Sequence, residues 1–402
     1  MNTSTAPLET ETTVSSVRHC GAALAVLTAC VFVVGTAEWV MVGLLPELSA
    51  DWHRPLPTVG SLVTWYALVV TVAGPLVTLG MLRLARRHAL LVLLGVFVAG
   101  NLAAALAGSF NALVAARMLT ALTHSTAFAT AMVIAVAMMP AARRGRAIAV
   151  VTAGWNLATV LGAPLGTWIG DHYGWRITFW AITALAALVL CSVTVLVRPP
   201  ALRAIPRPLD EVRGLLRLRV GLVLTIIAVA QAGLFTAYTY IAPLLQQVSD
   251  FTPSAVTTLL ALFGLGAVAG NVLGGRLADR ASWAGLCSLL VALAGVLAAF
   301  GFTSRIQWTS ALTVLVLGVV AAALIPLLQE RALAAAPAAP TLVTAISASA
   351  FNLGVAGGSQ LGGYALTTGL ALTDLPWTGA LLAAGAVLIA AATAQNHHTC
   401  QQ

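Results

Sequence analysis

The chain has 402 residues, of which 60% are hydrophobic and only 8% are charged, and its mean hydropathy is +0.96. Soluble globular chains carry roughly 25% charged residues, so this composition excludes an ordinary soluble protein, and the net charge of +8 does not indicate nucleic-acid binding. The uncharged stretches are long enough to cross a bilayer as helices and too long for barrel strands. We therefore predict an all-α integral membrane protein.

Apolar runs between charged residues predict twelve transmembrane helices in two bundles of six. The bundles cover residues 21–197 and 220–395, and the charged segment 198–219 joins them as a cytoplasmic linker. Residues 1–20 are predicted to be a disordered cytoplasmic tail, and residues 396–402 a second cytoplasmic tail. The predicted helices cover residues 21–45, 58–81, 89–108, 112–138, 147–170, 177–197, 220–246, 254–275, 283–303, 308–328, 341–368 and 376–395.

The arginines predict the orientation of the chain. All 20 basic residues are arginines, and all but four of them fall on one side of the predicted membrane. Arg54, Arg176 and Arg305 fall on the other side, and Arg117 lies inside a helix. Because cytoplasmic loops collect positive charge, we expect both termini in the cytoplasm and the chain in the cytoplasmic (inner) cell membrane.

An internal repeat predicts two copies of one six-helix unit. Residues 155–166 read WNLATVLGAPLG and residues 351–362 read FNLGVAGGSQLG, and Asn156 and Asn352 are 196 residues apart. The same interval separates the loops that begin at Gly74 and Gly270. An interval near half the chain indicates two related halves.

Small residues in the repeat suggest either close helix packing in lipid or a hinge on which the two halves rock around a central site. The proline of the first copy is expected to bend its helix. In the loop after the eighth helix, an acid between two arginines is expected to form a tight turn. The residues assigned to packing or gating are Gly162, Pro164, Gly166, Gly275, Asp279, Arg280, Gly358 and Gly362.

Glu38 and Arg117 are the only acid and the only base deep inside predicted helices. A charge at such depth is costly unless it is paired or hydrated, so its default interpretation is functional. At about 1.5 Å per residue, Glu38 lies about 25 Å from the inner end of its helix and Arg117 about 7 Å from the outer end of its own. In a core about 30 Å thick these depths coincide. The two residues are therefore expected to meet in a central cavity.

Two interpretations of this pair remain. Movement of Arg117 toward or away from Glu38 would switch the carboxyl group between releasing and holding a proton. Alternatively, the two form a permanent salt bridge that joins helices. His124, two turns from Arg117, is either a proton relay or a packing residue.

Aromatic rings and a few amides are expected to line the cavity. Such a wall suits an amphipathic aromatic compound better than a sugar, which needs many polar partners. The expected lining residues are Trp39, Trp65, Tyr66, His124, Trp155, Asn156, Tyr238, Tyr240, Phe351 and Asn352.

Several motifs together resemble the major facilitator superfamily. Residues 35–52, GTAEWVMVGLLPELSADW, and residues 143–180, which contain GAPLG, look like the twelve-span drug:proton antiporters. Within these, the chain is similar to actinobacterial chloramphenicol exporters and to arabinose or sugar efflux proteins. In that family the glycine and proline motif of the fifth helix, here around Pro164, marks exporters. The sequence departs from the family at Arg83, where the loop between the second and third helices normally carries an acid.

The resemblance implies alternating-access efflux of a small aromatic antibiotic of the chloramphenicol type, driven by protons and conferring resistance. Sugar or metabolite efflux, and nutrient import by the same fold, are the alternatives. The sequence shows no phosphate-binding loop, metal-ligand spacing or nucleophile arrangement, so we expect no enzyme activity, no metal and no cofactor beyond a proton gradient. The expected partners are a small-molecule drug, protons and the lipid bilayer, with no nucleic acid, and the expected functional unit is a monomer.

Overall fold

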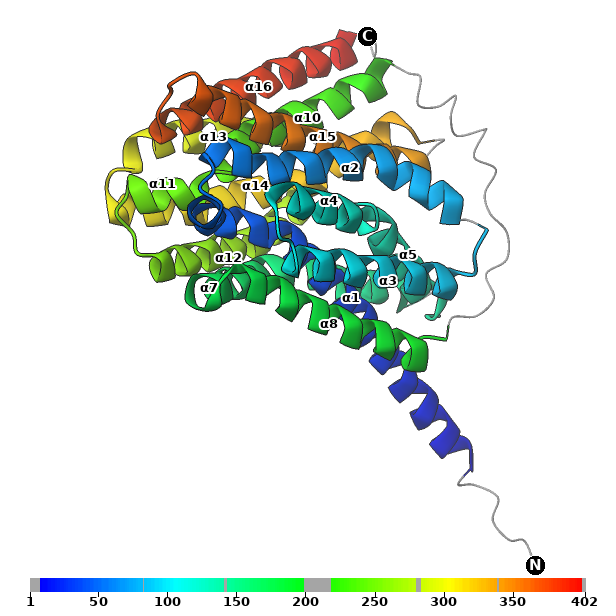
Figure 1. Ribbon diagram of the computed structural model, residues 1–402. Helices are drawn as coiled ribbons and strands as arrows, with labels where there is room; N and C mark the ends of the chain where they lie inside the picture. The colour runs from blue at the N-terminus through cyan, green and yellow to red at the C-terminus, as the bar shows by residue number, and fades with distance from the viewer. Residues whose placement is uncertain are drawn as a thin grey trace, which may run out of the picture.

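The computed structural model describes residues 8–81, 83–140, 143–198, 218–279, 283–337 and 340–399. Throughout these residues the regular structure is helical (Figure 1), and the described part of the chain contains no strand. Twelve helices there are long and apolar enough to cross a membrane. The predicted all-α fold with twelve transmembrane helices is confirmed.

The first six spans form the amino-terminal half. The fourth and fifth of them are each built from more than one helical element. The elements are α1 (Leu8–Asp51), α2 (Leu56–Met81), α3 (Arg86–Ala105), α4 (Phe110–Ala121) followed by α5 (His124–Ala137), α6 (Arg144–Leu157) followed by the π-helical turn η2 (Ala158–Gly162) and α7 (Ala163–Tyr173), and α8 (Trp175–Leu196).

The last six spans form the carboxyl-terminal half. Each begins within two residues of the position that the 196-residue interval predicts from the first half, so the repeat extends through the whole chain. The elements are α10 (Leu218–Tyr238) followed by α11 (Ile241–Gln247), α12 (Pro253–Ala278), α13 (Trp283–Thr303), α14 (Gln307–Ala335), α15 (Pro340–Thr367), and the 3-10 turn η3 (Leu372–Asp374) followed by α16 (Leu375–Thr399).

Helix extends into both segments that were predicted to be tails. α1 begins at Leu8 and α16 ends at Thr399, so the prediction of a disordered tail over residues 1–20 is wrong from Leu8 onward. Residues 8–20 and 396–399 contain neither glycine nor proline, so nothing in the sequence interrupts the backbone hydrogen bonds there. Most of the predicted linker, residues 199–217, lies outside the described residues.

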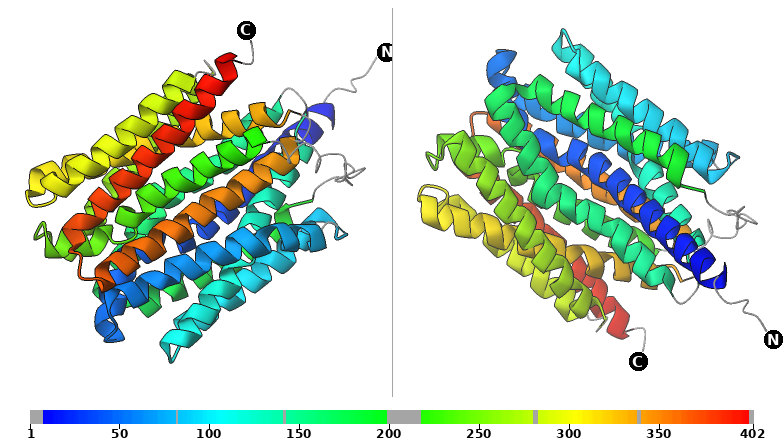
Figure 2. Two further views of the ribbon diagram at one scale, coloured as in Figure 1. Left: turned by 90° about the horizontal axis from the view of Figure 1, so that it is seen from above. Right: turned by 90° about the horizontal axis from the view of Figure 1, so that it is seen from below.

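The two halves meet along two equivalent pairs of helices. α2 of the first half packs against α15 of the second, and α12 of the second half packs against η2 and α7 of the first. The two views in Figure 2 show one of these pairings each. Because the repeat relates the second span to the eighth and the fifth to the eleventh, one contact is the copy of the other. The first residues of α1 and the last of α16 lie at the same end of the bundle (Figure 1).

Two irregular spans position polar residues between the halves. The fourth span bends after Arg117, where Thr120 Oγ1 donates to Arg117 O at 2.7 Å and Thr123 Oγ1 donates to Thr120 O at 2.8 Å. Hydroxyl groups that bond to carbonyls of the preceding turn bend helices. The fifth span, in which we expected a bend at Pro164, contains the π-helical turn η2 just before that proline, which has no N–H to donate.

Candidate functional site

A small cavity lies between the two halves. Its free volume is about 20 Å³, enough for about one water molecule. Its polar residues come from the amino-terminal half, whereas the other half contributes apolar side chains of α10 and α15. The cavity is lined by Glu38, Trp39, Met41, Val42, Val63, Tyr66, Ala67, Arg117, Phe235 and Val355. Glu38, Trp39, Tyr66 and Arg117 were predicted to lie here, and the structure brings them together.

Glu38, His124 and Tyr66 form a polar chain across three helices. Glu38 Oε2 on α1 lies 3.8 Å from His124 Nε2 on α5. The other ring nitrogen, His124 Nδ1, lies 2.9 Å from the Tyr66 hydroxyl on α2. The Glu38 side chain is 16% exposed and that of His124 is 7% exposed, so both lie largely out of contact with solvent. His124 is therefore the immediate partner of the deep carboxyl group.

Arg117 lies beside this polar chain and has no acidic partner among the described residues. Its guanidinium carbon is 4.4 Å from the centre of the Tyr66 ring and 5.9 Å from that of Phe179. The residue is 1% exposed, and its Nε and Nη1 groups have no hydrogen-bond partner in the structure. Within the described residues no ion pair joins Arg117 to Glu38. The two residues share the cavity as expected, but this conformation contains no salt bridge between them.

An aromatic cluster covers the side of the cavity that faces the second half. Trp39 packs on Phe235 with ring centres 5.9 Å apart and on Tyr238 at 5.7 Å. Phe235 also contacts Tyr238 at 5.7 Å and Phe351 at 6.3 Å. These tilted and edge-to-face arrangements are the favourable ones for aromatic pairs. Phe235 was not among the predicted residues, although its position 196 residues after Trp39 could have identified it.

Five predicted aromatic residues lie outside the cavity lining: Trp65, Trp155, Tyr238, Tyr240 and Phe351. Tyr238 and Phe351 belong to the aromatic cluster around Phe235. Trp65 is 46% exposed on α2. Trp155 packs edge-on against His124, with ring centres 5.4 Å apart, and so supports the imidazole from behind. Tyr240 is fully buried, donates to Ser359 O at 3.3 Å and lies against Gly60 of the other half. Tyr240 therefore belongs to the contact between the halves.

The two repeated asparagines have different surroundings. Asn271 Nδ2 on α12 donates to Asn156 Oδ1 on α6 at 2.9 Å, which joins the two halves. Asn352 Nδ2 donates to Ala348 O of its own helix at 3.0 Å, and its Oδ1 has no partner in the structure. Neither amide lines the described cavity.

The repeated glycines contact helices of their own half. A Cβ atom on Gly162 would lie 2.0 Å from Thr36 Oγ1, and one on Gly166 would lie 2.5 Å from Val40 Cγ2, both on α1. Cβ atoms on Gly358 and Gly362 would lie 2.3 Å and 2.7 Å from backbone oxygens of α10. Pro164 is buried next to them. These positions show close packing within each half, and the hinge role stays a prediction.

The loop after α12 is described only in part. Asp279 is exposed, and its N–H donates to Gly275 O at 3.1 Å, which forms the last turn of the helix. A Cβ atom on Gly275 would meet nothing within 4 Å. Arg280, which was assigned with them, lies outside the described residues.

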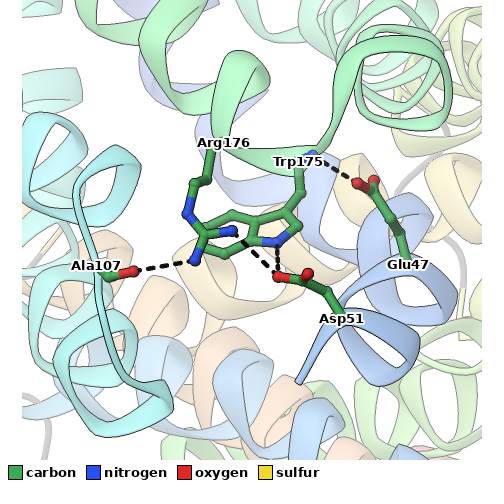
Figure 3. A network of polar contacts seen from close by, with 5 residues as sticks. All are labelled: Glu47, Asp51, Ala107, Trp175 and Arg176. Atoms are coloured by element: carbon green, nitrogen blue, oxygen red, sulfur yellow. Dashed lines mark hydrogen bonds and ion pairs between the residues drawn. The ribbon is translucent and has the colours of Figure 1, made fainter. Parts of the chain in front are cut away.

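A second polar network, which the sequence reasoning missed, joins α1 to the start of α8 (Figure 3). Glu47 Oε1 accepts the Trp175 backbone N–H at 2.6 Å, and Asp51 Oδ2 accepts from Trp175 Nε1 at 2.8 Å and from Arg176 Nη1 at 3.1 Å. Arg176 Nη2 donates to Ala107 O at 3.2 Å. Helix starts have free N–H groups that attract carboxylates, so acids ending one span could have indicated this contact.

Comparison with known proteins agrees with this architecture. The profile described as Major Facilitator Superfamily matches residues 27–359. The inner membrane transport protein YdhP of Escherichia coli K12 is 35% identical over 358 residues, which cover 89% of this chain and 92% of that protein. A chloramphenicol resistance protein of Streptomyces lividans is 33% identical, over 91% of this chain and 95% of its own. A probable sugar efflux transporter of Mannheimia succiniciproducens is 31% identical, over 89% and 90%.

Solved structures share the fold. A bacterial homologue of the human lysosomal transporter Spinster, in an inward-facing and unoccupied conformation, superposes with a TM-score of 0.72 at 16% identity and covers 94% of this chain and 96% of its own. The human organic anion transporter MFSD10 gives a TM-score of 0.65, also at 16% identity, over 92% and 99%. The chain belongs to the Major Facilitator Superfamily and is a multi-pass cell-membrane transporter, not an enzyme.

Proposed function

We propose that the protein exports a small, uncharged or weakly charged aromatic antibiotic of the chloramphenicol type in exchange for protons. The observation that carries the proposal is the cavity itself, which combines the deep carboxyl group of Glu38 with the aromatic rings of Trp39 and Phe235, against which Tyr238 packs. Alternating access would expose this cavity to each side of the membrane in turn.

The polar side of the cavity supports proton coupling. The nearest polar partner of Glu38 Oε2 is His124 Nε2 at 3.8 Å, and among the described residues this oxygen makes no hydrogen bond. Arg117 carries two N–H groups without partners. Polar groups that lack hydrogen-bond partners in one conformation can gain them when the halves move. A carboxyl group whose partners change in this way can take up and release a proton. The proton gradient would then supply the energy, with no further cofactor.

The apolar side supports an aromatic substrate. Once the halves separate and the cavity opens, a neutral aromatic compound can stack on the rings of Trp39 and Phe235 without leaving a buried charge unpaired. The Trp39 indole N–H, which has no partner among the described residues, can donate to it. A cationic substrate would compete with the proton for Glu38. A sugar requires many polar partners, whereas most of the lining is apolar. Among the relatives, the Streptomyces lividans protein is named for chloramphenicol resistance, which favours the same choice.

The relatives named as probable sugar efflux transporters make sugar efflux the second candidate. The test uses a susceptible host that expresses the wild-type protein, the Glu38→Gln variant or an empty vector. We expect the wild type alone to raise the inhibitory concentration of amphenicols. Protection against lipophilic cations only, or a change only in the accumulation of labelled arabinose, would contradict the substrate assignment.

A further inference from the structure

We infer that Tyr66 and His124 form the proton relay that loads and unloads Glu38, with the Tyr66 hydroxyl as the point at which protons join the relay. This inference rests on the proposed proton coupling and names residues and a route that the coupling by itself does not require. It is carried by the continuous contact from Tyr66 through both nitrogens of one imidazole ring to Glu38.

The geometry gives each imidazole nitrogen one partner. Nδ1 lies at hydrogen-bond distance, 2.9 Å, from the Tyr66 hydroxyl, and Nε2 lies 3.8 Å from Glu38 Oε2. The second distance is about 1 Å longer than a hydrogen bond and too short for a water molecule on the line between the two atoms. A relative shift of about 1 Å between the two side chains would bring them to hydrogen-bond distance. Trp155 and Tyr66 hold the ring by edge-on contacts at 5.4 Å and 5.7 Å, so the imidazole keeps this orientation.

The relay moves one proton in three linked transfers. With Glu38 ionised, the Tyr66 O–H donates to Nδ1 and the Nε2–H points to the carboxylate. An arriving proton binds the Tyr66 oxygen as the original hydroxyl proton passes to Nδ1, and the Nε2 proton passes to Glu38 Oε2. The ring has then changed tautomer, Glu38 is protonated, and each other group has kept its number of protons. Unloading reverses the three transfers.

The charges around His124 favour transfer of the proton to Glu38 over its retention on the imidazole. The titratable or charged side chains that face His124 within the described residues are Glu38 from α1, Tyr66 from α2 and Arg117 from α4. A proton held on the imidazole would make a second positive charge near Arg117, and like charges repel strongly at low dielectric. The proton is therefore passed to the carboxylate, where it cancels a negative charge.

The test measures protonation of Glu38 directly and needs no transported substrate. Purified protein in liposomes is subjected to a rapid drop in pH, and infrared difference spectroscopy follows the carbonyl band of a protonated carboxylic acid. The band that is absent in Glu38→Gln belongs to Glu38. Tyr66→Phe removes the hydroxyl and keeps the ring beneath Arg117, and His124→Gln keeps a polar side chain that cannot change tautomer. Tyr364→Phe, at a position that is 64% exposed, is the matched control.

We expect the Glu38 band to appear at least about 10-fold more slowly in Tyr66→Phe and His124→Gln, with unchanged final amplitude, and at the wild-type rate in Tyr364→Phe. The unchanged amplitude separates a lost relay from a misfolded site. Wild-type rates in both relay variants would overturn the relay and leave the proposed function standing. Slowing in His124→Gln alone would overturn the role of Tyr66. A wild-type spectrum without a Glu38 band would overturn the proposed coupling and the relay together.

Discussion

The two halves of the molecule differ most at the positions that the repeat places around the cavity. At the interval of 196 residues two aromatic positions are kept, since Trp39 corresponds to Phe235 and Trp155 to Phe351, whereas Tyr238 corresponds to Val42. The polar positions are not kept. Glu38, Tyr66, Arg117 and His124 correspond to Leu234, Leu262, Thr313 and Val320. The comparison teaches that the central aromatic pair, Trp39 and Phe235, belongs to the shared architecture, whereas the polar chain and the neighbouring Arg117 are present in the first half alone.

The contacts between the halves differ in the same way. Asn156 bonds to Asn271 across one interface, whereas the equivalent position to Asn271 in the other interface is Pro75, which has no amide to offer Asn352. Asn352 accordingly keeps an oxygen without a partner in the structure. One interface is therefore held by a side-chain hydrogen bond that its copy cannot form.

The largest effect is expected from Glu38→Gln, which makes the polar half of the cavity resemble the other half. Without a carboxyl group to titrate, uphill transport in vesicles should be lost, while binding of a labelled amphenicol remains, because the aromatic wall is unchanged. Glu330→Gln on α14, outside the cavity, is the control and should transport normally. Full uphill transport by Glu38→Gln would show that coupling does not depend on this half.

The second-largest effect is expected for thermal stability, at the equivalent glycines Gly162 and Gly358. A Cβ atom on Gly358 would lie 2.3 Å from the Ala232 backbone oxygen, whereas one on Gly162 would meet the side chain of Thr36. Overpacking costs about 1–3 kcal/mol, and a backbone cannot rotate away as a side chain can. Gly358→Ala should therefore lower the thermal stability in detergent more than Gly162→Ala.

Gly357 provides the control for this comparison, since a Cβ atom there would meet nothing within 4 Å. Gly357→Ala should leave the unfolding temperature near that of the wild type. If Gly357→Ala and Gly358→Ala were equally destabilising, the cost would come from the loss of glycine and not from the contact with α10.

A smaller effect is expected for the amide pair. A double-mutant cycle of Asn156→Ala and Asn271→Ala, followed by thermal unfolding, should give a coupling energy of about 0.6 kcal/mol, the average for hydrogen bonds between membrane helices. The cycle of Asn352→Ala with Pro75→Ala should give none. Equal coupling in the two cycles would mean that the interfaces are equivalent in energy despite their different residues.

The smallest effect is expected for Arg176→Gln in the network of Figure 3. The Arg176 and Asp51 side chains are 42% and 46% exposed, and exposed ion pairs contribute about 0–1 kcal/mol. The free energy of unfolding should fall by at most about 1 kcal/mol, and by less at high salt, because salt screens the ion pair. Glu47→Gln, which weakens the acceptor of a part-buried backbone N–H, should cost more. A larger loss from Arg176→Gln would indicate that Arg176 holds α8 in place by itself.

Much of the fold could be predicted because hydropathy and span length decide it. The twelve helices and their repeat follow from apolar runs and from one motif that occurs twice, and the structure confirms them. Depth counting also placed Glu38 and Arg117 in one cavity. It could not identify His124 as the direct partner of Glu38, because depth gives the height along a helix and not the rotation about its axis. Trp65 shows the same limit, since it differs from Tyr66 by one position and is exposed.

The π-helical turn at Ala158–Gly162 gives the fifth span one residue more than an α-helix of equal length would hold. Each residue turns an α-helix by about 100°, so deletion of one residue within this turn would regularise the helix and rotate everything before it by about that angle relative to α7. Trp155 would then leave His124, and Asn156 would leave Asn271. The extra residue thus sets the rotation of the first part of the span relative to the second. One part can then face the relay while the other packs its glycines on α1.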